Sequence, residues 1–174
     1  MFERINITDI IREHLKTLRS LNQTSKGIYF PDLVLFFLLP IFISLWLTYK
    51  HIDLTEQISN LIAAIAILGG FLFNLLAIIY GAMDKLKVDA TNNKIKKKFI
   101  KEIHSNISFC ILLSIFSTVC LILYSYKLPD YCIYIFIKNW LLFINYFLLL
   151  LFLLTLLMVL NRVYVLLKKD ANDL

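Results

Sequence analysis

Four apolar stretches, each long enough to cross a lipid bilayer as a helix, occupy about half of this chain. They cover residues 33–49, 58–83, 107–126 and 137–160. A helix needs about 20 apolar residues to cross the hydrocarbon core of a membrane. Hydrophobic residues make up 60% of the 174 residues, above the roughly 45–50% of a soluble domain. We therefore predict an all-α integral membrane protein, a four-helix transmembrane bundle.

The basic residues are shared unevenly among the segments that flank these stretches. Of the 18 lysines and arginines, only Lys50, Lys127 and Lys138 lie in the first and third connections or at the adjoining start of the fourth stretch. The other fifteen lie before the first stretch, between the second and third, and after the fourth. Because cytoplasmic segments carry such an excess, we expect a multi-pass protein with both termini in the cytoplasm. The same rule accounts for the net charge of +6 without nucleic acid, so we expect no direct nucleic-acid binding.

The chain divides into residues 1–30, a predicted amphipathic cytoplasmic helix, and 31–174, the four-span domain with a basic cytoplasmic loop at 84–102. Apolar residues of the first segment recur at helical spacing and share one face with His14: Ile7, Ile10, Ile11, Leu15 and Leu18. Two interpretations fit this helix. It lies in the inner membrane interface, or it docks onto a cytosolic partner or a neighbouring subunit.

Basic side chains on this helix and in the loop are candidate contacts for lipid headgroups or for an acidic partner. They are Arg12, Lys16, Arg19, Lys94, Lys96, Lys97, Lys98 and Lys101. Apolar residues interleave with the loop lysines at near-helical spacing. This pattern predicts that the third helix begins in the cytoplasm, ahead of its apolar stretch.

The second stretch carries a seam of small and polar residues at steps of three and four. The seam consists of Ser59, Ala63, Ala66, Gly70, Asn74, Ala77 and Gly81. Helices in lipid associate where small residues allow close approach and where polar side chains bond across the contact. We expect the seam to pack against a helix, and the polar side of the third stretch, with Asn106, Cys110, Ser114 and Ser117, is a candidate. Asn74 is either such a contact or a pore or ligand contact.

The other two stretches are less specific. Pro40 lies near the middle of the first stretch and predicts a kink, because proline removes one helical hydrogen bond and clashes with the preceding turn. The fourth stretch is the richest in leucine. We expect it to be the most exposed to lipid.

Residues able to carry out chemistry are missing from the predicted spans. No acid and no histidine lies in a span interior, where an enzyme acting within the membrane needs ionisable groups. The three histidines and three cysteines have no metal-ligand spacing and no paired arrangement. We predict a non-enzymatic protein with no catalytic residue, no cofactor and no metal site.

The segments IREHLKTL, ISNLIAAIAILGGFLFNLLAIIYG and NNKIKKKFIKEI, in this order and topology, resemble the small four-helix membrane subunits of bacterial antiphage defence systems. KwaA of the Kiwa system represents that family. The resemblance covers length, order of elements and topology across most of the chain.

The resemblance implies a homo-oligomeric sensor and scaffold in the bacterial inner membrane, with a tetramer favoured. Such a subunit would recruit a cytosolic, DNA-binding, KwaB-like partner through the cytoplasmic helix and the lysine-rich loop. The alternative is an effector that assembles into an oligomeric pore and depolarises the membrane of infected cells. A scaffold depends on its basic cytoplasmic face, whereas a pore depends on Asn74 or on the serines of the third span.

Overall fold

The computed structural model describes residues 7–18, 34–88, 94–126 and 132–172, and this part of the chain is helical with no strand. A short helix α1 (Ile7–Thr17) comes first. The segments η2 (Val34–Leu38), α3 (Leu39–Tyr49) and η3 (Thr55–Gln57) follow. The long helices are α4 (Ile58–Val88), α5 (Lys94–Ser125) and α6 (Cys132–Asn172). These three are long and apolar enough to cross a membrane, whereas Val34–Tyr49 is a shorter apolar helix.

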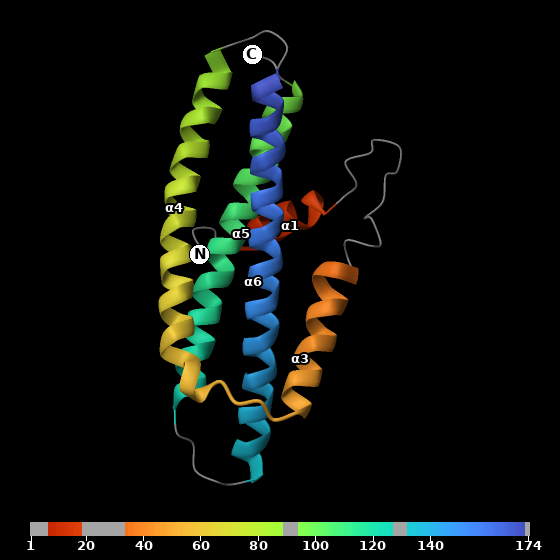
Figure 1. Ribbon diagram of the computed structural model, residues 1–174, viewed down its shortest axis with the longest axis vertical. Coiled ribbons are helices and arrows are strands. Elements are labelled where there is room, and N and C mark those ends of the chain that lie inside the picture. The colour runs from red at the N-terminus through yellow and green to blue at the C-terminus, as the bar shows by residue number, and fades with distance from the viewer. Residues whose placement is uncertain (1–6, 19–33, 89–93, 127–131, 173–174) are drawn as a thin grey trace.

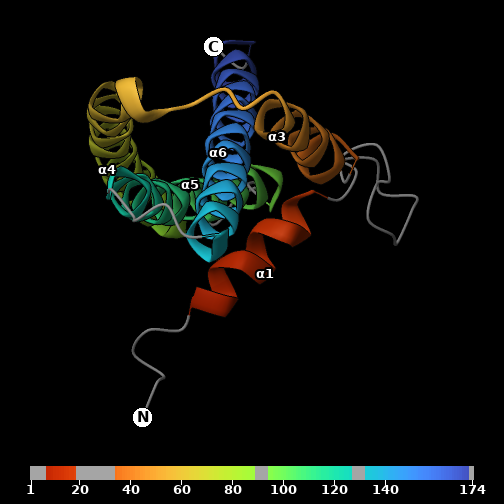
Figure 2. The same cartoon turned by 90° about the horizontal axis from the view of Figure 1, so that it is seen from below.

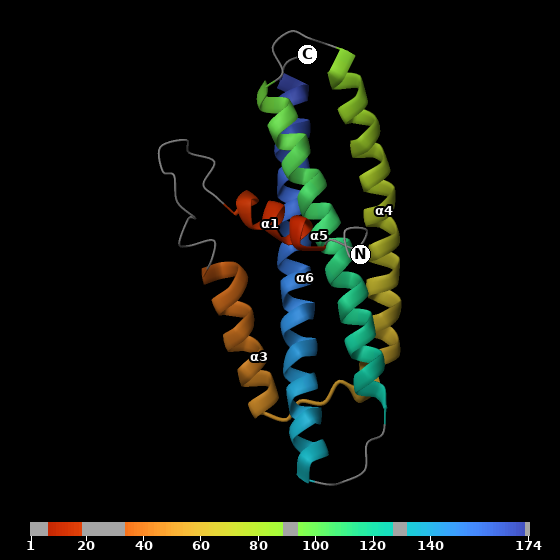
Figure 3. The same ribbon diagram turned by 180° about the vertical axis from the view of Figure 1, so that it is seen from behind.

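The helices lie side by side in the order α4, α5, α6, α3 (Figures 1 and 2). α5 packs against both α4 and α6, and α3 packs against the opposite side of α6. Figure 3, the view from behind, shows α1 lying across α5. Among the described elements, α4 has α5 as its main helical neighbour. Part of one side of α5 is therefore covered by α1, and α4 and α3 lie at the two ends of the row.

Helices α4 and α5 extend well into the segment predicted as a basic loop. α4 continues to Val88 and α5 begins at Lys94, so most of 84–102 is helical. The segment is rich in lysine, which favours helix, and has no glycine or proline to end one. The prediction that the third helix begins ahead of its apolar stretch is confirmed.

The core is centred on α5, and half of its apolar window is buried inside the protein. The corresponding share is 39% for α6 and 22% for α4. The expectation that the fourth stretch is the most exposed is therefore wrong, because α6 lies between α5 and α3 whereas α4 has one long neighbour. Asn145 of α6 is fully buried and donates from Nδ2 to the carbonyl oxygen of Cys120 on α5 at 3.2 Å. This bond fixes α6 against α5 in a region where lipid offers no hydrogen bonds.

The irregularity at Pro40 takes the form of a wide helical turn. Residues Val34–Leu38 are π-helical, and α-helical geometry begins at Leu39. A local π-helical adjustment is one way that membrane helices accommodate a proline, whose ring clashes with the carbonyl group four residues earlier, here that of Phe36. Pro40 and Phe36 are both buried, which places this turn against the rest of the protein.

Candidate functional site

The small-residue seam of α4 faces away from the rest of the protein. All seven of its members are exposed, and nothing lies within 4 Å of a Cβ built on Gly70 or Gly81. The expected contact between the seam and the polar side of α5 is therefore wrong. α4 packs on α5 through a different face, whose buried residues recur at steps of seven: Ile58, Ile65, Leu72 and Ile79.

Gly69, one position away from the seam, makes the close approach to α5. A Cβ at Gly69 would lie 3.4 Å from Oγ of Ser114. Ser114 and Ser117 are buried inside the protein. The polar side of α5 thus contacts a glycine of α4, although not the one that the seam predicted.

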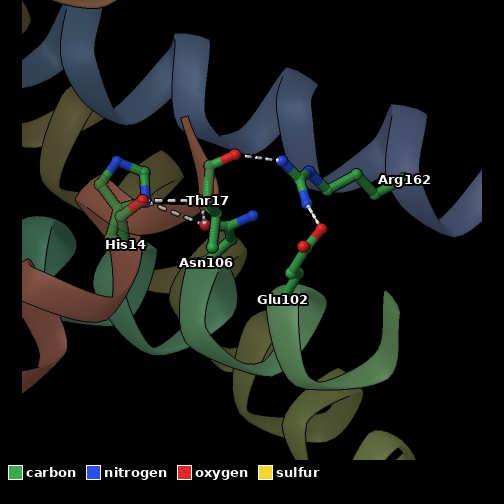
Figure 4. Close-up of polar contacts among 5 residues, drawn as sticks. All are labelled: His14, Thr17, Glu102, Asn106 and Arg162. Atoms are coloured by element: carbon green, nitrogen blue, oxygen red, sulfur yellow. Dashed lines mark hydrogen bonds and ion pairs between the residues drawn. The ribbon is translucent and has the colours of Figure 1, made fainter. Parts of the chain in front are cut away.

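A polar cluster joins α1 to α5 and α6, and Figure 4 shows its members: His14, Thr17, Glu102, Asn106 and Arg162. Oδ1 of Asn106 accepts hydrogen bonds from Nδ1 of His14 at 2.9 Å and from Oγ1 of Thr17 at 2.6 Å. His14, Thr17 and Asn106 are all buried. The side of α1 that carries His14 therefore packs inside the chain, which decides against a helix that presents this side to lipid or to a partner.

Aromatic contacts complete the environment of His14. Its ring stacks on Phe109 of α5, with centroids 3.9 Å apart and planes at 13°. It also meets the edge of Phe36 of η2, with centroids 6.5 Å apart. α1 thereby bridges α5 and the beginning of the η2–α3 segment.

Arg162 of α6 connects the three helices of the cluster. It donates to the Glu102 carboxylate of α5 and, at 2.6 Å, to the carbonyl oxygen of Thr17 in the last turn of α1. The side chains of Arg162 and Glu102 are only 11% and 18% exposed. A cation at the C-terminus of a helix satisfies a carbonyl group that has no partner within the helix and opposes the negative end of the helix dipole. Arg162 therefore caps α1 and pairs with α5 at the same time.

The cluster keeps His14 uncharged. Burial, partly opposed by the hydrogen bond to Asn106 and reinforced by Arg162, lowers the pKa of His14 to about 4. A neutral ring with its proton on Nδ1 fits the bond to Asn106, because Oδ1 is an acceptor. The docked form of α1 is thus the form expected at neutral pH.

The candidate basic contacts fall into three groups. Arg12, Lys16, Lys98 and Lys101 are exposed. Lys94, Lys96 and Lys97 lie in the first turns of α5, and their side chains are outside the described part, as is Arg19. The exposed members come from α1 and α5, and Glu13 joins the two helices by contacting Lys16 and Lys101.

A second polar cluster holds the connection between α3 and α4 at the opposite end of the long helices. Oδ1 of Asp53 accepts from Oγ1 of Thr55 at 2.6 Å and from the hydroxyl group of Tyr124 at 2.7 Å. Its Oδ2 lies 3.8 Å from Nζ of Lys138. The hydrogen bonds from Thr55 and Tyr124 lower the pKa of Asp53 to about 2. The hydroxyl group of Tyr146 donates to the carbonyl oxygen of Ile52 at 3.0 Å, so α5 and α6 both bind this loop.

Sequence reasoning missed the pair of Glu102 and Arg162. Glu102 precedes the start of the third stretch, and Arg162 follows the end of the fourth. Because the two helices run in opposite directions, both residues come to the same end of the bundle. Two opposite charges at one depth of neighbouring helices were therefore a usable signal. The Asp53 cluster was missed because its members are separated by up to 94 positions in the sequence and carry no shared pattern.

In the part of the chain that the structure describes, no group of three or more histidine, cysteine, aspartate or glutamate side chains could hold a metal ion. No protein-family model, curated protein or solved structure matches the chain. The fold itself defines the class, an all-helical protein with three helices long and apolar enough to cross a membrane.

Proposed function

We propose that the chain is a non-enzymatic, multi-pass protein of the bacterial inner membrane with both termini in the cytoplasm. The end of α4, the beginning of α5 and the end of α6 lie at one end of the molecule (Figure 1). The uneven distribution of lysine and arginine supports making this the cytoplasmic end. The opposite end carries few basic residues, and Lys50 and Lys138 are two of them.

The η2–α3 segment would supply a fourth crossing beside the three long helices. Its 5 and 11 residues reach about 24 Å along a helix axis, short of a hydrocarbon core about 30 Å thick. Local thinning of the bilayer absorbs a mismatch of this size at a modest cost. The long helices, in contrast, extend beyond the hydrocarbon core at the basic end.

The observation that carries the proposal is the exposed seam of α4. An amide such as that of Asn74, at mid-membrane depth and facing outward, finds no hydrogen-bond partner in lipid. A second copy of the chain would supply both a polar partner for Asn74 and a surface for close approach at Gly70 and Gly81. The seam therefore supports a homo-oligomer, and a tetramer remains our preferred assembly.

We propose that this oligomer is a sensor and scaffold in an antiphage defence complex and recruits a cytosolic, KwaB-like, DNA-binding partner. Support comes from the resemblance to the defence subunits and from Lys98 and Lys168, which are exposed on helices that extend past the hydrocarbon core. A candidate alternative is an oligomeric pore that depolarises the membrane. Because Ser114 and Ser117 are buried within one copy, the face of α4 around Asn74 would have to line such a pore.

Native mass spectrometry of the tagged protein, expressed from its own operon and extracted in mild detergent, separates these functions. A fixed oligomer with a stoichiometric soluble protein supports the scaffold. A bare oligomer that makes liposomes leak supports the pore, and a monomer contradicts both.

Gly70→Leu tests the seam itself. The larger side chain prevents close approach, so we expect the oligomer to dissociate while each copy keeps its fold. Phe71→Leu, a change at an exposed position about 100° around the helix from Gly70, is the matched control and should stay assembled. If the Gly70→Leu protein remains fully assembled in detergent, the seam does not form the contact.

A further inference from the structure

Glu13 brings basic side chains of two helices together. Its Oε1 lies 2.5 Å from Nζ of Lys16 on α1, and its Oε2 lies 3.7 Å from Nζ of Lys101 on α5. Both lysines stay accessible, with 51% and 73% of the side-chain surface exposed. Arg12, one helical turn before Lys16, is exposed as well. The result is a basic surface in which Lys16 and Lys101 contact the Glu13 carboxylate. Arg12 lies one turn away on the same helix, and the carboxylate of Asp9 is exposed on the same side of α1.

The depth of this surface follows from the length of α5. Tyr124 binds the loop at the outer end of the helix, and about 20 residues span the hydrocarbon core from there. The inner boundary of the core then falls near His104. Lys101 lies about 5 Å farther along the axis, within a headgroup layer about 5–7 Å thick. α1 crosses α5 near Asn106 (Figures 2 and 3), about 3 Å on the core side of this boundary. Lys16 still reaches the layer of Lys101, because Glu13 contacts both lysines. Arg12 lies one turn from Lys16 on the same helix.

We propose that Arg12, Lys16 and Lys101 bind the headgroup phosphate of an anionic phospholipid of the inner leaflet. The inference rests on the membrane placement proposed above. A phosphate between these side chains gains the attraction of three cations, and each basic residue near a membrane surface adds about a factor of five to the affinity for anionic lipid. Ile11, exposed beside Arg12, offers an apolar contact for the acyl chains.

Lipid fits this surface better than a soluble acidic protein does. The surface lies in the headgroup layer, whereas a soluble protein would first meet the ends of α4, α5 and α6, which extend farther into the cytoplasm. The surface is also held in place from beneath, because Asn106 and Arg162 fix the buried side of α1.

Glu13 competes with the lipid phosphate for the same two lysines. The hydrogen bond from Lys16 lowers the pKa of Glu13, so the carboxylate is ionised at neutral pH. Removing its charge should therefore strengthen binding of anionic lipid, whereas removing the lysines should weaken it. These opposite signs separate a lipid site from a purely structural ion pair.

The experiment measures phosphatidylglycerol retained by the purified full-length protein, by native mass spectrometry, against phosphatidylcholine. We expect Lys16→Gln/Lys101→Gln to weaken phosphatidylglycerol binding about 30-fold and Glu13→Gln to strengthen it about five-fold. Lys50→Gln/Lys138→Gln removes two charges at the other end of the molecule and should leave binding unchanged. Binding of phosphatidylcholine should not change in any variant.

The inference is overturned if the Lys16/Lys101 variant binds phosphatidylglycerol like the wild type or if Glu13→Gln weakens binding. It is also overturned if inorganic phosphate alone gives the same thermal stabilisation as the lipid, or if an acidic soluble protein occupies the surface and excludes lipid. Reporter fusions at the two termini test the membrane placement separately. Cytoplasmic termini together with an unchanged Lys16/Lys101 variant would refute the lipid site and leave the proposed topology intact.

Discussion

Replacing Arg162 with methionine tests whether one guanidinium group holds three helices together. Arg162 of α6 donates to Glu102 of α5 and to the carbonyl oxygen of Thr17 on α1. Methionine retains much of the apolar stem and removes the charge and both hydrogen bonds. We expect α1 to detach and Glu102 to be left as a largely buried carboxylate without its partner.

The magnitude follows from the burial of the pair. Breaking a buried ion pair costs about 3–5 kcal/mol, whereas an exposed pair contributes about 0–1 kcal/mol. With 11% and 18% of the two side chains exposed, the pair of Arg162 and Glu102 is close to the buried limit. Loss of the bond to the last turn of α1 adds about 1 kcal/mol. We expect Arg162→Met to lower the free energy of unfolding by about 4–6 kcal/mol.

Unfolding by SDS in detergent micelles, followed by circular dichroism, measures this free energy, and hydrogen exchange of residues 7–17 reports whether α1 is docked. Glu102→Gln in the Arg162→Met protein removes the orphaned charge, so the double variant should recover about 1–2 kcal/mol. The reasoning is refuted if Arg162→Met costs less than about 1 kcal/mol or if the amides of α1 stay protected.

Three further outcomes are expected. Gly69→Leu should push α4 away from α5, because a Cβ there already lies 3.4 Å from Oγ of Ser114. In the same SDS titration the free energy of unfolding should fall by about 2–3 kcal/mol. Gly70→Leu, at an open position, should leave the stability of one copy unchanged. The pKa of His14 is lowered from 6.5 to about 4, so docking of α1 is complete above pH 6.5 and is lost as pH falls toward 4. Hydrogen-exchange protection of the α1 amides should fall over this pH range in the wild type. His14→Phe should show a flat profile, and a flat profile in the wild type as well would contradict the prediction. The pKa of Asp53 is lowered from 3.8 to about 2, so its contribution to the thermal midpoint should disappear between pH 4 and pH 2 and should be absent in Asp53→Asn.

The helices themselves were predictable, but their neighbours were not. Within a bilayer, a long apolar segment satisfies its backbone by forming a helix, so composition and length suffice. Helix α4 shows the limit of prediction from composition and length. Its seam is the more conspicuous packing signal, yet within one copy the helix packs through isoleucines and a leucine at steps of seven. Apolar side chains are as suitable for lipid as for a neighbouring helix, so a sequence pattern does not separate the two faces.

The candidate site was predictable in its parts and not in its pairing. Helical spacing placed His14 on the apolar face of α1 and Asn106 on the polar side of the third stretch. Their hydrogen bond joins residues 92 positions apart, and no local pattern contains that information. The positions of Lys16 and Lys101 around Glu13 depend on the same docking of α1. Pairing of this kind is set by the tertiary contact of α1 with α5.

The 41 residues of α6 contain neither glycine nor proline. Lys138 near one end of this helix approaches Asp53, and Arg162 near the other end holds α1. The two residues are separated by about 36 Å along one uninterrupted axis. A stiff helix rotates and slides as a unit, so movement of the outer loop that turns α6 must also turn Arg162 relative to α1. Helix α6 thus couples the two sides of the proposed membrane mechanically.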